Sequence, residues 1–356
     1  MTVQGPLERE RALELRPPVT QLRTSGALPG MRDPAPDQWP ALPYAEWKET
    51  LYAVHMWTHV IGKIRLALTP LVNHWWNSTL FVTPRGLTTT MMPSGNDALQ
   101  IDFDFVDHEL VIVRSRGGRS SIPLAPMSVA HFYRQVLDRL AGLGLPDPRI
   151  MPVPVEVPTT IPFLKDRAIR PYDREQVERL HTALVKTEFV FDRFRADFLG
   201  KASPPQFFWG GFDLASARFS GRRGPPYAGG SAPNVHIHVM HEAYFDELIA
   251  AGFWFGTDEI PRPEFYSYAM PAPAGLASAT IRPDAAEWLP DRGEFVLAYE
   301  AVRTATDPAA MLLSFLQSTY DAAADLGGWD RRLLEERPRC DCARLPAHSR
   351  AAHAGR

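Results

Sequence analysis

The sequence predicts an α+β protein built from two similar helix–antiparallel strands–helix units, an internal duplication packed as one two-lobed body. Three observations predict this class. Long segments with apolar residues at helical spacing alternate with clusters of short strand patterns. One pair of strand patterns reads as a hairpin, and a tryptophan followed nine residues later by an arginine, after a nearby proline, recurs in both halves of the chain.

Composition divides the chain into five segments. The first residues are rich in Pro, Arg and Glu, and the last contain almost no large apolar side chain, so both ends are expected to be disordered. Closely spaced prolines between the two units favour an extended connector. The predicted segments are the leader at 1–36, the first unit at 38–145, the connector at 146–172, the second unit at 173–334 and the tail at 335–356.

The first unit is predicted to hold a long helix, an interrupted strand, a hairpin and a closing helix. The helical spacing of the first element stops at Pro70, and residues 99–106 alternate apolar and polar side chains like a half-buried strand. Pro84 indicates an edge strand or a bulge, because proline cannot donate to a sheet ladder. The elements are expected at 44–68, 79–90, 99–106 with 109–114, and 126–143.

The second unit is predicted to begin with another long helix, for which Asp173 is a candidate N-cap. A loop rich in Gly, Pro and Arg, several strands, a short helix and a closing helix follow. Helices are expected at 174–199, 242–250 and 308–326, the loop at 221–233, and strands at 207–219, 235–240, 265–270 and 295–299.

Matching residues support the duplication. Each long helix ends near a Gly-Lys pair, which precedes a Thr-Pro or Ser-Pro, and in both halves an arginine follows a tryptophan by nine residues. The matched positions are Gly62-Lys63, Trp76 and Arg85 in the first half, and Gly200-Lys201, Trp209 and Arg218 in the second. Chance similarity between common elements is the alternative. If the units are related copies, a groove where they meet is a usual place for a ligand.

Charge and cysteine content exclude several classes of protein. The 356 residues carry a formal net charge of −3, so neither a nucleic acid nor an anionic membrane is expected as a partner. Signal-peptide and bilayer-spanning patterns are not found in the sequence, so no membrane association is expected. The two cysteines, Cys340 and Cys342, cannot form a disulfide framework, which favours a reducing compartment and hence the cytoplasm.

Several runs between residues 39 and 330 combine aromatic, basic and small residues in a specific pattern. They include Asn73-His74-Trp75-Trp76, Pro84-Arg85-Gly86-Leu87-Thr88, Phe208-Trp209-Gly210, Arg218-Phe219-Ser220-Gly221-Arg222 and Phe315-Leu316-Gln317-Ser318-Thr319-Tyr320. With these runs the chain resembles an uncharacterised bacterial family that is catalogued as domain of unknown function 5996. The resemblance implies no particular activity, because that family has none assigned.

Aromatic and basic residues cluster at matching places in both units and are the first candidate for a binding site. Tryptophan offers a flat apolar wall and an N–H donor, and arginine offers a rigid fork for a carboxylate or phosphate. A Trp/Arg-lined pocket between the units would bind, or act on, a small anionic molecule with a planar or apolar body. Alternatively, the tryptophans belong to the core and the arginines are paired or solvated. The candidates are His74, Trp75, Trp76, Arg85, Trp209, Asp213, Arg218 and Arg222.

A second hypothesis is a metal-dependent hydrolase that uses His236, His238 and His241. Two histidines separated by one residue on a strand point to the same side, and three histidines can form an open catalytic zinc site. His55 and His59 lie four apart on a predicted helix, but the glutamate of a zincin motif is absent. Packed or hydrogen-bonded histidines are therefore favoured on that helix.

The sequence leaves the reaction and any cofactor open. It contains no nucleophile elbow, phosphate-binding P-loop or dinucleotide fingerprint. Glu109, Asp213, Glu242 and His74 could each serve as a general base. The third hypothesis is a non-catalytic scaffold whose grooves bind a protein partner.

Overall fold

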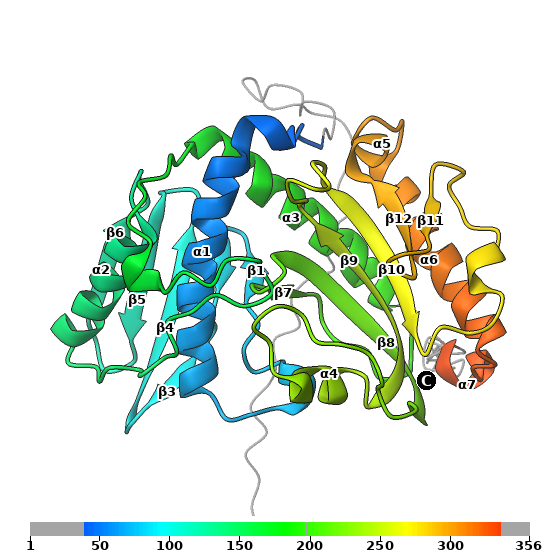
Figure 1. The fold of residues 1–356 in the computed structure, drawn as a ribbon, viewed down its shortest axis with the longest axis horizontal. Coiled ribbons are helices and arrows are strands. Elements are labelled where there is room, and N and C mark those ends of the chain that lie inside the picture. Colours follow the sequence, from blue (N-terminus) through cyan, green and yellow to red (C-terminus); the bar gives the residue numbers. More distant parts are fainter. Residues whose placement is uncertain (1–38, 197, 336–356) are drawn as a thin grey trace, which may run out of the picture. The chain divides into compact units, whose positions relative to one another are not determined.

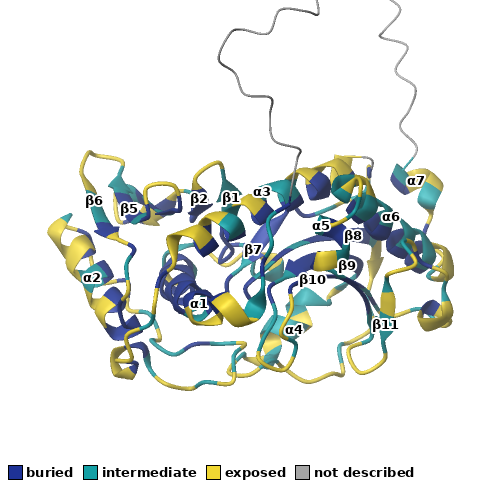
Figure 2. Cartoon of the chain, turned by 90° about the horizontal axis from the view of Figure 1, so that it is seen from above, coloured by how far each residue is buried: buried dark blue, intermediate teal, exposed yellow. Residues whose placement is uncertain are grey.

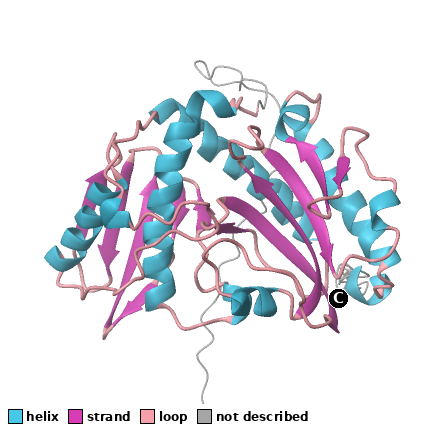
Figure 3. Cartoon of the chain, viewed as in Figure 1, coloured by secondary structure: helices cyan, strands magenta, loops and turns pink. Residues whose placement is uncertain are grey.

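The computed structural model describes residues 39–196 and 198–335, which lie in one compact unit of the chain (Figure 1). Helices and antiparallel sheets are both present, which confirms the α+β class (Figure 3). The predicted leader, and the predicted tail apart from its first residue, lie outside the described residues. The helices are α1 (Tyr44–Leu68), α2 (Val129–Gly142), α3 (Arg174–Ala196), α4 (Ile237–Ala243), α5 (Tyr299–Arg303), α6 (Pro308–Leu326) and α7 (Arg331–Glu335), with 3-10 turns η1 (Asn73–Trp75), η2 (Phe163–Lys165) and η3 (Leu276–Ser278).

The first sheet is antiparallel and holds the predicted hairpin, with Ile101 opposite Ile112. The side chains of Leu99, Ile101 and Phe103 are buried, as their alternation with polar residues predicts. The order of its strands is β1 (Phe81–Thr83), β2 (Gly86–Thr88), β4 (Asp97–Asp104), β5 (Glu109–Arg114) and β6 (Arg119–Pro123), and β3 (Met92–Ser94) also pairs with β4.

The second sheet is also antiparallel and is buried on both faces. Ile249 and Phe253 of β9 belong to the main core, which includes α6, whereas Leu248 and Ala250 on the opposite face belong to a second, smaller apolar cluster. The order of its strands is β11 (Glu287–Leu289), β12 (Glu294–Ala298), β10 (Glu264–Met270), β9 (Asp246–Trp254), β8 (Asp213–Arg223) and β7 (Gln206–Phe208).

A backbone bridge connects the two sheets. The amide of Leu80 donates to the carbonyl of Phe207 at 2.9 Å, and the amide of Phe207 donates back at 2.8 Å. Both side chains are fully buried. The bridge therefore places β1 beside β7 and lets one apolar core continue from one sheet to the other.

The helix α1 is buried nearly all round instead of along one stripe (Figure 2). It packs against α2, α3 and β3. Thr58 and Arg65 interrupt the apolar spacing of the helix. Both are nevertheless buried, because protein surrounds the helix at these positions. The guanidinium of Arg65 donates to the hydroxyl of Thr90 at 3.0 Å.

The predicted strand at 79–90 has to be corrected to two short strands. Pro84 lies in the turn that joins β1 to β2, where its missing N–H costs no ladder hydrogen bond. Gly86 follows with φ of 152°, and a Cβ at this position would overlap the carbonyl oxygen of Phe103. The proline thus ends one strand and does not mark a bulge within it.

The elements predicted at 235–240 and 242–250 are exchanged in type. Most of the first segment lies in the short helix α4, which His236 caps, and most of the second lies in the strand β9. Local helix propensity in residues 242–250 is overridden because β9 pairs with β8 on one side and β10 on the other. Tyr299, predicted in a strand, begins α5.

Replacement of Trp57 by alanine should lower the free energy of unfolding by about 3–5 kcal/mol, the usual cost of removing a buried aromatic ring. Trp57 is 0% exposed and stacks on Phe132 and Tyr172, with ring centroids 5.0 and 5.6 Å away. Chemical denaturation measures the loss. The control Leu71→Ala, at an exposed position, should change the stability little, and a loss as small for Trp57→Ala would contradict this packing.

Candidate functional site

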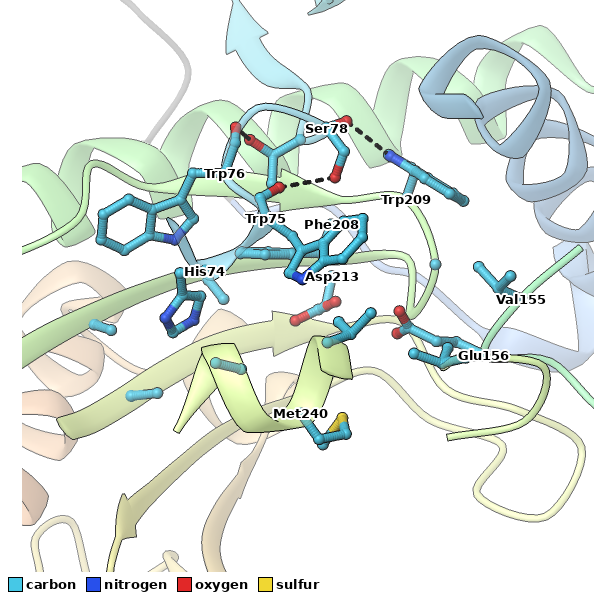
Figure 4. A pocket seen from close by; sticks show the side chains of 18 of the residues that line it. His74, Trp75, Trp76, Ser78, Val155, Glu156, Phe208, Trp209, Asp213 and Met240 are labelled. Carbon is cyan, nitrogen blue, oxygen red and sulfur yellow. Dashed lines mark hydrogen bonds between the residues drawn. The ribbon is translucent and has the colours of Figure 1, made fainter. Parts of the chain in front are cut away.

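A cavity of about 400 Å³ lies on the face of the second sheet that is turned away from α6 (Figure 4). Strands β8, β9 and β10 form its floor, and η1, α4, the end of α1 and the connector surround it. Aromatic side chains dominate its lining: His74, Trp75, Trp76, Phe208, Trp209, His236, Tyr244, Tyr266 and Tyr268.

Small residues on the floor create the space. Ala215 and Ala250 line the cavity, and Gly252 pairs with Ala215 on one side and Tyr266 on the other. The ring of Tyr266 lies over Gly252, where any Cβ would overlap it. Tyr266 can therefore reach across β9 and donate its hydroxyl hydrogen to the carboxylate of Asp213 on β8.

The wall opposite this floor is a strained turn. His74 and Trp75 both have positive φ values, 62° and 57°, which are rare for residues other than glycine. The hydroxyls of Ser78 and Thr79 donate to the carbonyls of Trp75 and Trp76, and the rings of His74 and Trp76 stack at 5.0 Å. The indole N–H of Trp75 is buried and has no acceptor among the described residues.

Trp209 closes the cavity beside α1. Its indole N–H donates to the carbonyl of Ser78 at 2.8 Å (Figure 4). The ring rests on Gly62, where a Cβ would overlap it. The ammonium of Lys63, one residue further along α1, lies 5.9 Å from the centre of the Trp209 ring.

Two carboxyl groups converge in the cavity. Asp213 Oδ1 and Glu156 Oε2 lie 2.9 and 3.4 Å from the point where a side chain at Gly211 would begin, so these oxygens are within about 6 Å of each other. Figure 4 shows Asp213 between Trp75 and Met240, with the carboxylate of Glu156 beside it and below Trp209. Two carboxyl groups at this distance disfavour each other's ionisation, because each negative charge repels the other.

Burial shifts the protonation of both acids. It raises the pKa of Glu156 to about 7, and the nearby charge of Asp213 adds to this shift. Burial also raises the pKa of Asp213 to about 6, partly offset by the hydrogen bond that Tyr266 donates. Glu156 is nevertheless exposed, because its side chain reaches the open space of the cavity. Both carboxyl groups are therefore able to gain or lose a proton near neutral pH.

Two histidines of α1, the half-buried His55 and the buried His59, hold the segments that carry these groups. The Nε2 atom of His55 lies 2.9 Å from the carbonyl of Gly210, and that of His59 lies 2.8 Å from the carbonyl of Val155. Burial lowers the pKa of His55 to about 3 and that of His59 to about 4. Both rings are therefore neutral at pH 7 and position the backbone next to Glu156.

The structure brings together five of the eight residues predicted for the pocket. These five line the cavity: His74, Trp75, Trp76, Trp209 and Asp213. Burial lowers the pKa of His74 to about 4, so its ring is neutral at pH 7. The remaining candidates are all arginines.

The expected arginine lining has to be corrected, because none of the three side chains is among the described residues that line the cavity. Arg85 forms ion pairs with Asp104 and Asp107 at the β1–β2 turn. Arg222 pairs with Glu247 and donates to the carbonyls at the end of α6. The guanidinium groups of Arg85 and Arg222 therefore form their hydrogen bonds and ion pairs outside the cavity.

Arg218 is buried against the main core and does not line the cavity. Its guanidinium donates to the carbonyl of Phe194 and lies 3.5 Å from the centre of that ring and 4.3 Å from that of Tyr320. The alternation along β8 explains this, because Ala217 faces the cavity side and Arg218 the opposite side.

The predicted metal site also has to be corrected. His236 caps α4 and His238 and His241 lie on that helix, so the strand geometry behind the prediction does not apply. Only His236 of the three lines the cavity. Within the described residues, no group of three or more His, Cys, Asp or Glu side chains is arranged to hold a metal ion. Glu109, one of the other proposed bases, pairs with Arg119. The two cysteines lie outside the described residues.

Sequence reasoning missed Glu156, Lys63, Tyr266 and Tyr268 as lining residues. Glu156 lies in the proline-spaced connector, where a single acid carries no pattern. Its φ of 60° and the hydrogen bond from its amide to the carbonyl of Pro233, at 2.7 Å, fix it against the cavity. The tyrosines alternate along β10 and could have been found as one polar-tipped face.

Backbone strain is concentrated around the cavity. Eight residues other than glycine have positive φ in the described part of the chain, and four of them line the cavity. These four are His74, Trp75, Glu156 and Asn234. Such conformations cost energy and persist mainly where function or packing requires them, so their concentration here favours a functional cavity.

Together, the fold and the cavity define an α+β protein with an aromatic cavity that holds a pair of acids. The chain belongs to the family of unknown function DUF5996, whose model matches residues 39–336, and the predicted family membership is thus confirmed. No curated protein and no solved structure matches the chain. Of the helices in 39–335, with residue 197 left aside, none is long and apolar enough to cross a membrane.

The variant Glu156→Gln should melt at a higher temperature than the natural protein above pH 7. An acid whose pKa is raised from 4.5 to about 7 by folding destabilises the folded state once it ionises, and glutamine removes that charge. The gain should shrink as the pH falls from 7 and vanish below about 4.5. Thermal melting across this pH range measures the difference.

The matched control is Glu109→Gln, which removes an acid that is paired with Arg119 outside the cavity. It should give no gain in melting temperature above pH 7. A Glu156→Gln variant that is less stable than the natural protein at high pH would show that the carboxylate is held by favourable contacts.

Proposed function

We propose that the protein binds a small molecule in this cavity, and that the ligand has a planar apolar body with a cationic or hydrogen-bond-donating group. The observation that carries the proposal is the convergence of Glu156 and Asp213 within an aromatic lining. A volume of about 400 Å³ is within the range of small-molecule sites. The ligand would lie on the tryptophans with its donor group between the acids.

The charges of the lining favour this ligand over the anionic one expected from the sequence. Carboxylates can accept hydrogen bonds or pair with a cation, and the faces of tryptophan and tyrosine attract a cation further. The three predicted arginines have acceptors or packing partners elsewhere in the described structure. The same lining argues against a protein-binding scaffold, because its aromatic groups surround a concave space.

The acid pair also supports an enzymatic role, as a second candidate. Two carboxyl groups with pKa values of about 7 and 6 can each exchange a proton near neutral pH. In this role Glu156 would serve as the general acid, because its pKa is the higher of the two, and Asp213 as the base. A ligand that is turned over, and not only bound, would distinguish the two roles.

We also propose that the two halves are copies related by an internal duplication that forms two lobes. The strand order supports it: β1, β2, β4, β5 and β6 of one sheet run in the same sequence as β7, β8, β9, β10 and β12 of the other. A long helix precedes each series, and the helices α2 and α6 come after them. The bridge between Leu80 and Phe207 joins the two first strands where a pseudo-two-fold axis would pass.

A reducing, cytoplasmic location is proposed from composition alone. The sequence has two cysteines, at positions 340 and 342, and no disulfide framework can be built from them. A binding cavity made of tryptophan, tyrosine and carboxyl groups needs no oxidising compartment.

A panel of small ligands with one planar body and different charges tests the proposed function. Tryptamine should raise the melting temperature, because its ammonium group can pair with the acids, whereas indole-3-propionate should not. The double variant Glu156→Gln, Asp213→Asn should lose most of the tryptamine effect, since two neutral amides replace the two carboxylates. The control Glu109→Gln should keep it.

Stabilisation by the carboxylate and not by the amine would overturn the proposed charge preference. Stabilisation by neither, at concentrations up to the solubility limit of the ligands, would count against an indole-sized ligand in the cavity. Isothermal titration at pH 8, where both acids are mostly ionised, gives the same comparison as an affinity.

A further inference from the structure

Lys63 is an unusual side chain for its position on α1. Its residue is only 8% exposed, and it lines the cavity. Buried lysines are normally paired with an acid, yet the ammonium group of Lys63 has no hydrogen bond or ion pair within 39–196 and 198–335. Among the described residues, the ring of Trp209 is the one aromatic group near this ammonium group. Its centre lies 5.9 Å away, near the outer limit of a cation–π interaction.

The surroundings of Lys63 favour the neutral amine. Leu66 and Trp209 line the cavity together with Lys63, and His59 lies one turn earlier on α1. None of the three carries a negative charge. Burial lowers the pKa of Lys63, and the charge of Lys63 in turn opposes protonation of His59. The acids Glu156 and Asp213 line the same cavity, but neither forms an ion pair with Lys63.

We propose that Lys63 is a nucleophilic site that forms an imine with a planar aldehyde or ketone bound in the cavity. The inference rests on the proposed function, because it assigns a chemical class to the molecule that the same cavity would bind. A lysine amine that is buried among apolar side chains and has no ion-pair partner is the usual setting for this chemistry.

The reaction needs no further reactant. The lone pair of Lys63 Nζ attacks the carbonyl carbon, a carbon–nitrogen bond forms, and the carbonyl π bond breaks. The two hydrogens of the neutral amine leave with the oxygen as water, which gives a carbon–nitrogen double bond. The aromatic side chains of the lining would hold the planar body of the ligand. Glu156 and Asp213, which line the same cavity, can exchange protons with the reacting groups.

Reductive trapping of the natural protein tests this proposal. The protein is treated at pH 7 with benzaldehyde, which has a planar ring and one carbonyl, and with cyanoborohydride, which reduces the imine to a stable benzylamine. Peptide mapping by mass spectrometry then locates the adduct. The chain has five lysines, at 48, 63, 165, 186 and 201, so each can be scored separately.

Lys63 should be labelled faster than the exposed Lys48, Lys165 and Lys201. Because burial lowers the pKa of Lys63, a larger fraction of its amine is neutral at pH 7, so its labelling rate should exceed that of each exposed lysine. Lys63→Arg should abolish this fast label and keep the rest, whereas the control Lys201→Arg should keep it. Label on the exposed lysines with none on Lys63 would overturn the proposal without requiring any variant to fold.

Failure of this inference can be told apart from failure of the proposed function. If tryptamine stabilises the natural protein and Lys63 stays unlabelled, the cavity binds ligands but Lys63 is not a nucleophile. Free tryptamine also consumes benzaldehyde, which slows the labelling of all lysines alike. If tryptamine binds and lowers the labelling of Lys63 relative to that of the exposed Lys48, the amine and the aldehyde compete for one cavity, which supports both. If neither tryptamine binding nor an adduct is found, both are overturned.

Discussion

The burial of α1 on nearly all sides is the constraint on which the rest of the structure depends. A buried polar side chain on such a helix is costly unless it finds a partner within the protein, since water does not reach it. His55 and His59 therefore contact the carbonyls of Gly210 and Val155. These two contacts attach the β7–β8 turn and the proline-rich connector to the helix, and so they place Trp209 and Glu156 at the edge of one cavity.

The cavity itself follows from an exchange of large and small side chains across the second sheet. Alanine and glycine on β8 and β9 leave room above the floor, and Tyr266 crosses Gly252 to reach Asp213. The other side is held open by a turn in which His74 and Trp75 take left-handed conformations. Protein interiors are usually close-packed. A cavity that is lined by aromatic side chains and bordered by strained backbone is therefore typical of a ligand-binding site.

Residue patterns gave a sound account of the local structure where one periodicity was strong. The limits of α1 and the hairpin of β4 and β5 agree with the prediction, because an apolar spacing of either type leaves few alternatives. Around residues 235–254 the prediction was wrong, since β9 is specified by its pairing with β8 and β10, which is distant in sequence. Of the candidate site, the tryptophans and Asp213 were found and the arginines were misassigned, because alternation along a strand decides which face each side chain takes.

The sequence by itself determined the α+β class, the family and the aromatic character of the cavity, because periodicity and residue type are local properties. Only the tertiary structure decided the charge of the cavity. Arg218 and Asp213 lie on one strand, but the first enters the core and the second the cavity. Glu156 and Lys63 come from a connector and a helix with no shared pattern. They reach the same cavity because His55 and His59 hold the β7–β8 turn and the connector against α1.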